Sequence, residues 1–342
     1  MPPHGEPDPR DSAALDWARQ QLHDLGLDGG ADAQLMHDRP WSRLYRLGTP
    51  EAPHWLKVPG PRLRHEGLLV RTIARYEPDL VLAPEVVDTE HGWLVMPDGG
   101  TLLRAFAPGA ATLPHWERLL PQYAALQRTL VPHMSGLLAG GAPDRRPQRT
   151  VALADELAAL FTGDEAGLPE DFHVRFDGVR PALAQAANEL AESTVGSTVN
   201  HDDLHSSNIF VTLDADQQVV GYRISDWGDA AVAHPFTTLN ATLRSAAAHA
   251  ELEVNDPQVI RLRDVYLDAW SDLADRTDLL RWCELARWTG CVSRAAAWEW
   301  ALTAALNSDD AAVTASARQD RAEYVAGWLD ELTDIGIPAG VS

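Results

Sequence analysis

The chain has 342 residues, 45% of them hydrophobic, which is ordinary for a globular protein long enough to form two modest lobes. Its formal net charge of −22 argues against nucleic acid as a partner, because binding to phosphates depends on Lys and Arg. No apolar run approaches the roughly 18 residues of a membrane helix, and the N-terminus lacks the apolar segment of a secretory signal, so we expect neither a membrane span nor secretion.

The charge and the cysteines also bear on partners and location. A negative surface attracts cationic small molecules, although acidity also serves solubility alone, and both interpretations stay open. Cys283 and Cys291 lie eight residues apart in a helical pattern, about 12 Å along the axis, which excludes a disulfide between them if that helix forms. Reduced thiols are typical of a cytoplasmic protein. Nothing in the sequence indicates the oligomeric state.

The first sixty residues contain one helix followed by strand-like segments. Helical spacing predicts a leading helix over about residues 11–25. Two strand-like segments follow at residues 33–50 and 52–60, joined by a Gly-Thr-Pro turn. Residues 39–43 form a loop in the first segment, where Ser42 offers a hydroxyl or a backbone amide to a bound group. A purely structural loop is equally compatible with this pattern.

The second strand-like segment contains the sole lysine among 28 basic residues, Lys57. A charged side chain in an apolar strand is costly unless it has a partner or a ligand. In a chain that otherwise uses Arg, a retained Lys indicates a need for a compact ammonium group that points at phosphate oxygens. Nine residues later Glu66 opens a helical stretch at residues 65–78 and is the candidate partner of Lys57, with a surface role as the alternative.

The next segments are two strands and then mostly helix. Residues 85–90 and 91–100 are strand-like across a turn, and a helix is expected to begin near residue 101. Helical patterns recur at residues 113–134, 151–161, 180–193, 233–250 and 281–306.

The most informative stretch is residues 199–230. His201, Asp203 and Asn208 form an H-x-D-x-x-x-x-N pattern, and Asp226 follows in a D-W-G triplet. Residues 208–213 and 218–225 read as two strands of a hairpin, which would return Asp226 to the neighbourhood of Asn208. Phosphoryl transfer needs a carboxylate that orients the attacking hydroxyl, together with an amide oxygen and a second carboxylate that hold Mg²⁺. Asp203, Asn208 and Asp226 supply these groups in that order.

These two linked segments resemble the family of aminoglycoside phosphotransferases and related small-molecule kinases. Its members commonly show H-G-D-L-H-P-G-N followed by I-D-W-G-D, where this chain has H-D-D-L-H-S-S-N and I-S-D-W-G-D. Asp202 takes the place of the glycine that is usual in the family, and Ser206 and Ser207 replace Pro-Gly. Ser225 precedes Asp226 of the D-W-G triplet. Asp202 is an additional candidate base, but the register with Asn208 favours Asp203.

The resemblance implies an α+β, bilobal, protein-kinase-like fold. Residues 1–98 would form the nucleotide-binding lobe, with an antiparallel sheet, a helix and the leading helix. Residues 99–342 would form a larger, mainly helical lobe that carries the catalytic loop, the metal site and the acceptor pocket. Asp203 would be the catalytic base, Asn208 and Asp226 would hold Mg²⁺, and His201 would be a structural member of the loop.

The resemblance also implies a nucleotide site in the first lobe. Lys57 would contact the α and β phosphates of ATP or GTP, and Glu66 would hold Lys57 in place. Ser42 would lie in the loop over the phosphates. Backbone groups near Val95 and Met96 would bind the purine edge at the hinge between the lobes.

The expected function is Mg²⁺-dependent transfer of the γ-phosphate of ATP or GTP to a hydroxyl of a small amino-bearing or polyhydroxylated molecule, such as an aminoglycoside or another antibiotic. A metabolic amino-sugar or amino-alcohol kinase is the alternative within the class, since the acidic charge tilts only slightly toward a cationic acceptor. A protein kinase is disfavoured, because the H-R-D arginine, the glycine-rich loop and the A-P-E segment are missing. Two other classes remain open: a catalytically inactive pseudokinase, and a metallohydrolase built on His201, Asp202, Asp203 and His205.

Overall fold

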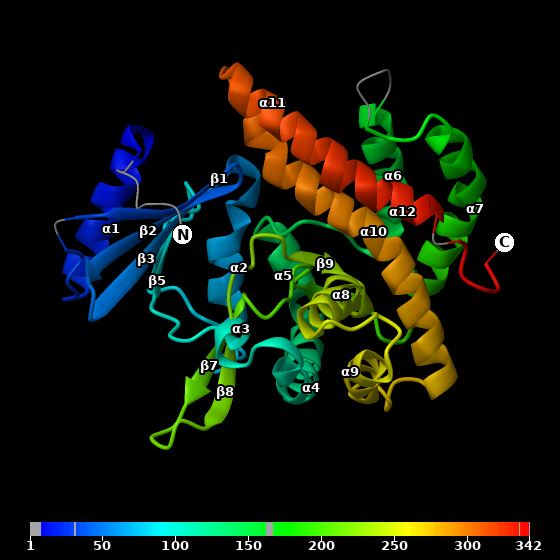
Figure 1. Cartoon of the computed structure of the whole chain (residues 1–342), viewed down its shortest axis with the longest axis horizontal. Helices are drawn as coiled ribbons and strands as arrows, with labels where there is room; N and C mark the ends of the chain where they lie inside the picture. Colours follow the sequence, from blue (N-terminus) through cyan, green and yellow to red (C-terminus); the bar gives the residue numbers. More distant parts are fainter. Residues whose placement is uncertain (1–7, 31, 162–166, 335, 342) are drawn as a thin grey trace.

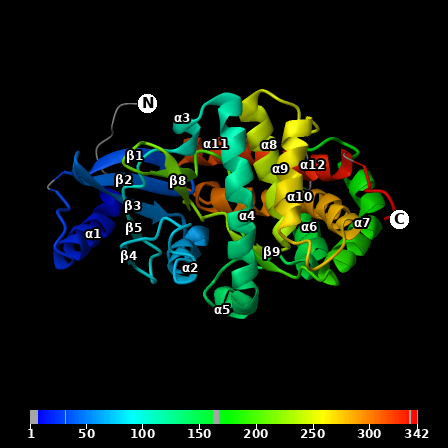
Figure 2. The same cartoon turned by 90° about the horizontal axis from the view of Figure 1, so that it is seen from below.

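A β-sheet forms one end of the molecule and helices form the rest (Figure 1). The computed structural model describes residues 8–30, 32–161, 167–334 and 336–341. The sheet and helix α1 (Ser12–Asp24) lie at one end, and helices α6 (Thr150–Ala158) and α7 (Phe172–Ala191) lie at the other (Figures 1 and 2). The α+β class with an N-terminal antiparallel sheet and a mainly helical remainder is confirmed.

The N-terminal sheet has five antiparallel strands in the order β1-β2-β3-β5-β4. Their bounds are β1 Gln34–Arg39, β2 Ser42–Thr49, β3 Ala52–Pro59, β4 Val86–Val87 and β5 Leu94–Pro97. The strand-like segment over residues 33–50 forms two strands, β1 and β2, on either side of the place where a loop was expected at residues 39–43. The chain reverses at Pro40 and Trp41, so that Arg39 pairs with Ser42 and the segment forms a tight hairpin. Pro40 has no N–H for a sheet ladder, which suits it to this turn.

Helix α1 covers the sheet, close to the bounds expected from its spacing. Its apolar face, including Leu15 and Leu22, shares a core with Tyr45, Leu47 and Val95. A 3₁₀ turn (Pro9–Asp11) precedes it, and the buried Asp11 carboxylate accepts hydrogen bonds from the Arg43 guanidinium and the Tyr45 hydroxyl. This buried ion pair fixes α1 to strand β2.

Helix α2 (His65–Ile73) belongs to both parts of the molecule. It follows a 3₁₀ turn (Pro61–Leu63) after β3, and its residues Leu69, Val70 and Ile73 join the large core of the helical part. The segment after α2 is attached to the same part, because Leu82 N–H donates to the Ile224 carbonyl at 2.9 Å and Ile224 N–H donates to Leu80 at 2.8 Å. These contacts join the sheet region to the catalytic stretch.

The rest of the chain is mainly helical, with two short antiparallel strand pairs. The pairs are β6 (Thr198–Asn200) with β9 (Ala231–Ala233), and the expected hairpin of β7 (Ile209–Leu213) with β8 (Val219–Ile224). The helices are α3 Leu103–Phe106, α4 Leu113–Leu130, α5 Met134–Ala139, α6 Thr150–Ala158, α7 Phe172–Ala191, α8 Thr238–Ala250, α9 Pro257–Asp268, α10 Arg276–Leu306, α11 Ala311–Asp320 and α12 Ala326–Asp334. Helix α7 starts eight residues before the expected position, with Pro181 in its interior.

Helix α10 is the longest element and reaches back to the N-terminal sheet. The rings of Trp41, in the β1–β2 turn, and Trp298, in α10, meet edge to face with centroids 5.5 Å apart. The Arg62 guanidinium lies 5.5 Å from the ring centre of Trp300. One face of α10 therefore contacts the sheet region beside the catalytic loop. Across the described ranges, no helix combines the length and apolarity of a membrane-spanning segment.

Candidate active site

The expected catalytic loop, residues 201–208, lies between β6 and β7, and its second residue, Asp202, has a left-handed backbone conformation. Its φ of 63° is uncommon for a residue with a Cβ, which explains why glycine suits this position in the motif. The Asp202 carboxylate is buried and accepts hydrogen bonds from Arg145 and Ser293, both at 2.8 Å, and from Asn200 at 3.1 Å. Its side chain is fully committed to the protein interior.

Asp203, unlike Asp202, lines two cavities that are described below. Its carboxylate lies 3.2 Å from the Arg294 guanidinium and 3.3 Å from His205 Nε2. Burial alone would raise the pKa of Asp203, but Arg294 and then His205 outweigh it, and the pKa is lowered. The carboxylate is therefore ionised and able to accept a hydrogen bond from a hydroxyl.

Asn208 and Asp226 are brought together by the β7–β8 hairpin, as its pattern predicts. Ile209 pairs with Ile224, and the Ser225 N–H donates to the Asn208 carbonyl at 2.8 Å. The Asn208 side-chain N–H donates to the Asp203 carbonyl at 3.1 Å, which leaves the amide oxygen for another partner. An amide oxygen and a carboxylate are the hard donors that Mg²⁺ prefers, so this pair fits a Mg²⁺ site.

Lys57 connects the sheet to the D-W-G turn that contains Asp226. Its Nζ lies 2.8 Å from Glu66 Oε1, 2.7 Å from Glu66 Oε2 and 2.6 Å from Asp226 Oδ1. Burial alone would lower the pKa of Lys57, but the Asp226 and Glu66 carboxylates outweigh it and raise the pKa. Glu66 is also held by the Trp227 N–H at 3.1 Å. The sequence pairing of Lys57 with Glu66 thus corresponds to a buried ion pair.

A cavity of about 570 Å³ lies between the sheet and the catalytic loop. Its polar end contains Lys57, Asp203, Asn208 and Asp226. Apolar side chains line much of the rest: Met36, Leu44, Leu82, Met96, Leu102 and Phe210. The volume is that of a pocket for a ligand of several rings or groups.

The expected nucleotide-site residues divide into two groups. Ser42 and Met96 line the large cavity, together with Arg39 and Trp41 of the β1–β2 turn. Val95 is not among the residues that line it, and the expected binding of a purine edge by backbone groups near Val95 and Met96 stays a prediction. The side chain of Val95 is buried in the core under α1, and its carbonyl oxygen accepts from the Glu85 N–H at 2.8 Å, because β5 is an interior strand.

A second cavity, of about 70 Å³, adjoins the first on the side of α10. Asp203, Lys57, Asp226 and Trp41 line both cavities. Residues of the smaller cavity that sequence reasoning left unassigned are Gly228, Asp229, Arg294, Ala297, Trp298 and Ala301. Burial raises the pKa of Asp229 to about 6, although Arg294 opposes this shift.

Arg294 and Asp229 each gave a signal in the sequence. Asp229 is the last residue of the quoted W-G-D segment, and Arg294 interrupts an otherwise apolar helical pattern, where a charge requires a partner.

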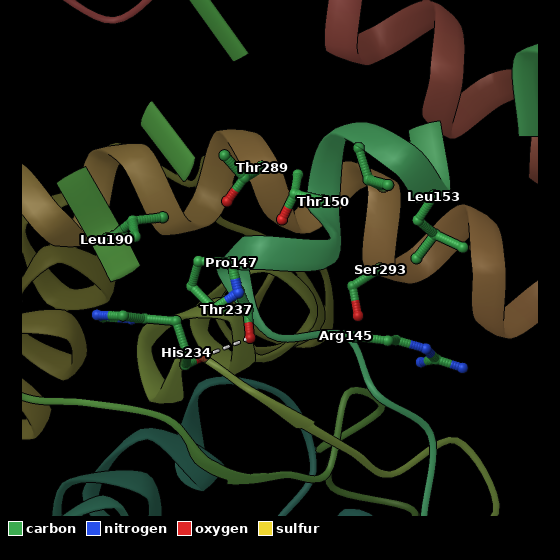
Figure 3. A pocket seen from close by; sticks show the side chains of 10 residues that line it. Arg145, Pro147, Thr150, Leu153, Leu190, His234, Thr237, Thr289 and Ser293 are labelled. Atoms are coloured by element: carbon green, nitrogen blue, oxygen red, sulfur yellow. Dashed lines mark hydrogen bonds between the residues drawn. The ribbon is translucent and has the colours of Figure 1, made fainter. Parts of the chain in front are cut away.

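A third cavity, behind Asp202, is too small for a substrate. Its volume is about 10 Å³, close to the space of a single water molecule. Figure 3 shows Thr150, Thr289 and Ser293 around it, with Arg145 at one side and His234 at another. This space belongs to the packing that supports the catalytic loop.

Both ring nitrogens of His201 form hydrogen bonds with backbone groups of the site. Its Nδ1 accepts the Asp203 N–H at 3.3 Å, so Nε2 carries the proton and donates to the Ser225 carbonyl at 2.9 Å. Burial lowers the pKa of His201 and favours this neutral form. Both nitrogens are used, which disfavours a metallohydrolase built on His201. Within the described ranges, no three His, Cys, Asp or Glu side chains cluster as metal ligands.

Comparisons with known proteins agree with this geometry at the level of the fold. No protein-family model matches the chain, and a sequence search finds no match among curated proteins. An ethanolamine kinase from Plasmodium vivax matches with a TM-score of 0.60 at 11% identity, over 92% of this chain and 88% of that one. Choline kinase LicA from Streptococcus pneumoniae matches with a TM-score of 0.55 at 12% identity, over 92% and 100% of the two chains. A macrolide 2′-phosphotransferase of type I matches with a TM-score of 0.54 at 16% identity, over 90% and 96%. This chain therefore has the bilobal, protein-kinase-like fold that these phosphotransferases and kinases share.

Proposed function

We propose that this protein is a Mg²⁺-dependent phosphotransferase that moves the γ-phosphate of ATP or GTP to a hydroxyl of a small molecule. The observation that carries the proposal is the arrangement around one cavity. Lys57, paired with Glu66, lies 2.6 Å from Asp226, and Asp203 and Asn208 line the same space. An ammonium group, two metal-binding oxygens and an ionised carboxylate are the parts that phosphoryl transfer requires.

The nucleotide would occupy the large cavity. Its apolar part, with Met96 at the edge, suits a purine base, and its polar end, with Lys57, suits the phosphates. Ser42, the first residue of β2, lines the same cavity and would lie beside the phosphates. We propose that residues up to about 98 form the nucleotide lobe and that the remainder forms the acceptor lobe.

The chemistry assigns one task to each side chain. Asn208 and Asp226 would hold Mg²⁺, which neutralises charge on the transferring phosphate when it is bound. Asp203 would accept a hydrogen bond from the acceptor hydroxyl, orient its oxygen toward the γ-phosphate and take its proton. Because the transition state is loose, orientation counts for more than base strength. The lowered pKa of Asp203 is compatible with this role.

The acceptor would enter the smaller cavity beside Asp203. A cationic amino-bearing acceptor would meet Asp203 and Asp229, but Arg294 already pairs with both carboxylates. The structural matches include proteins named for macrolide, choline and ethanolamine phosphorylation, which keeps antibiotic modification and a metabolic kinase as the two candidate roles.

One screen tests this function. The purified protein is incubated with Mg²⁺, ATP or GTP, and a panel of aminoglycosides, macrolides, amino sugars and amino alcohols, and each acceptor is examined by mass spectrometry for an added phosphate. We expect transfer to at least one acceptor, lost in Asp203→Ala. Nucleotide binding with neither transfer nor hydrolysis in the wild type would favour the pseudokinase instead.

A further inference from the structure

Arg294 makes three contacts around the catalytic loop from a buried position in α10. One guanidinium nitrogen donates to the Asp202 carbonyl at 2.7 Å and to Asp229 Oδ2 at 3.1 Å. The other terminal nitrogen lies 3.2 Å from Asp203 Oδ1. The side chain is 6% exposed, so solvent screens these interactions little.

We propose that Arg294 is a positioning residue that holds the Asp203 carboxylate in the orientation needed to bind the acceptor hydroxyl. The proposal rests on the proposed function and extends it to a residue of α10. A planar guanidinium fixes the direction of its hydrogen bonds, whereas a carboxylate on a loop otherwise has several rotamers. The other contact of the Asp203 carboxylate is His205, which lies on the same loop and supplies no support from outside it.

The rigidity of this contact comes from α10. The helix runs from Arg276 to Leu306, and Val292, Ala295 and Ala296 beside Arg294 are buried in the main core. Ser293, which precedes Arg294 in the helix, donates a hydrogen bond from its hydroxyl to the Asp202 carboxylate at 2.8 Å. Adjacent residues of one helix therefore hold adjacent residues of the catalytic loop.

The surrounding charged groups explain how the Arg294 guanidinium is tolerated in a buried position. Asp229 shares the guanidinium, and Arg145 donates to Asp202 at 2.8 Å and to the Asp229 carbonyl at 3.1 Å. Buried charges are tolerated where each has a partner and hydrogen bonds. Arg294 contacts none of Lys57, Glu66 and Asn208, so its influence is directed at the acceptor side of the site.

A double-mutant cycle separates positioning from simple structural support. In the wild-type background, we expect Arg294→Met to lower kcat on the order of 10- to 100-fold, because small misplacements of a reacting group have effects of this size. The KM for the nucleotide should change less than about threefold, since Arg294 does not contact Lys57. In the Asp203→Asn background, Arg294→Met should lower kcat less than about threefold, because Arg294 acts through the Asp203 carboxylate. Radiolabelled phosphate transfer detects the low residual rates.

Arg145→Met is the matched control. It also removes a buried guanidinium from an aspartate of this loop, but that aspartate is Asp202 rather than Asp203. We expect a similar fall in melting temperature for both variants and a clearly smaller loss of kcat for Arg145→Met. If Arg294→Met does not fold, the cycle is run with Arg294→Lys, which keeps a charge but loses the fixed geometry.

The outcomes distinguish this proposal from the function itself. An equal loss of kcat in the wild-type and Asp203→Asn backgrounds, or an unchanged kcat in Arg294→Met, would overturn the positioning role while leaving the phosphotransferase intact. A wild-type protein that neither transfers phosphate nor hydrolyses nucleotide would overturn both.

Discussion

Lys57 Nζ lies 2.6 Å from Asp226 Oδ1, although 169 residues separate them in the chain. The contact places the ammonium group of strand β3 on the carboxylate that is proposed to bind Mg²⁺. Glu66 lies on the other side of Lys57 and is almost fully buried, at 1% exposure of its side chain. Lys57 thus pairs with both carboxylates, so that the same contacts stabilise the fold and position the groups proposed to act on phosphate.

The Lys57–Glu66 pair gives a prediction on stability. Lys57→Met leaves the buried Glu66 carboxylate without its cation and should lower the free energy of unfolding by about 3 kcal/mol. Lys57→Met/Glu66→Gln removes both charges and should recover most of this loss. Urea denaturation measures both effects, and a double variant no more stable than the single one would contradict the prediction.

The two adjacent aspartates predict different kinetic effects. Asp203→Ala should abolish detectable transfer, because its carboxylate lines both cavities. Asp202→Gly should retain far more activity, since its carboxylate points to Arg145 and Ser293. Steady-state kinetics decides, and the reverse order would show that the base is Asp202.

The φ of 63° at Asp202 provides an internal control. Asp202→Ala and Asp202→Gly lose the same hydrogen bonds, but glycine adopts this conformation without strain. The glycine variant should therefore be more stable by about 1 kcal/mol.

His234 predicts a pH dependence of stability. Burial lowers its pKa to about 3, so the folded protein keeps it neutral while the unfolded chain binds a proton below about pH 6.5. Its contribution is present above that pH and is lost as the pH falls toward 3, by up to about 1.4 kcal/mol per pH unit. His234→Asn retains a side-chain acceptor for the Phe236 N–H and should flatten this slope in unfolding measurements between pH 6.5 and 4. An unchanged slope would assign the dependence to other groups.

Trp298 predicts a limit on acceptor size. Its ring and that of Trp41 both border the cavity of about 70 Å³. Trp298→Ala should raise kcat/KM for bulky acceptors relative to compact ones, because it removes a wall of this cavity. Ratios of kcat/KM across a size series measure the effect. Trp282→Ala, which alters the same helix away from the cavity, is the control and should leave the ratios unchanged.

The catalytic stretch could be predicted because its information is local. The spacing from His201 to Asn208 and the hairpin that returns Asp226 are encoded within about thirty consecutive residues. The lone lysine in an apolar strand indicated that Lys57 needs a partner or a ligand, and the family resemblance implied that Glu66 holds it in place. The structure pairs them directly.

Other features depend on contacts between distant segments. A role for Arg294 can be inferred only if it is known that α10 packs against the loop at Asp202, 92 residues away. Val95 is buried because β5 lies between β3 and β4 in the sheet. The order of strands in a sheet cannot be read from the pattern of polar and apolar residues within one strand. A loop at residues 39–43 was expected, but its form as a tight hairpin turn at Pro40 and Trp41 was not, because this turn lacks the glycine that usually marks a tight hairpin.

Trp41 borders the large cavity and the small one, and its ring rests against α10. A ligand that shifts the β1–β2 turn in one cavity changes the shape of the other at the same time. If the nucleotide occupies one cavity and the acceptor the other, as proposed, their affinities would be thermodynamically coupled, and each ligand would alter the dissociation constant of the other by the same factor. Trp41 is thus a wall common to both cavities, and it would transmit the binding of one proposed substrate to the site of the other.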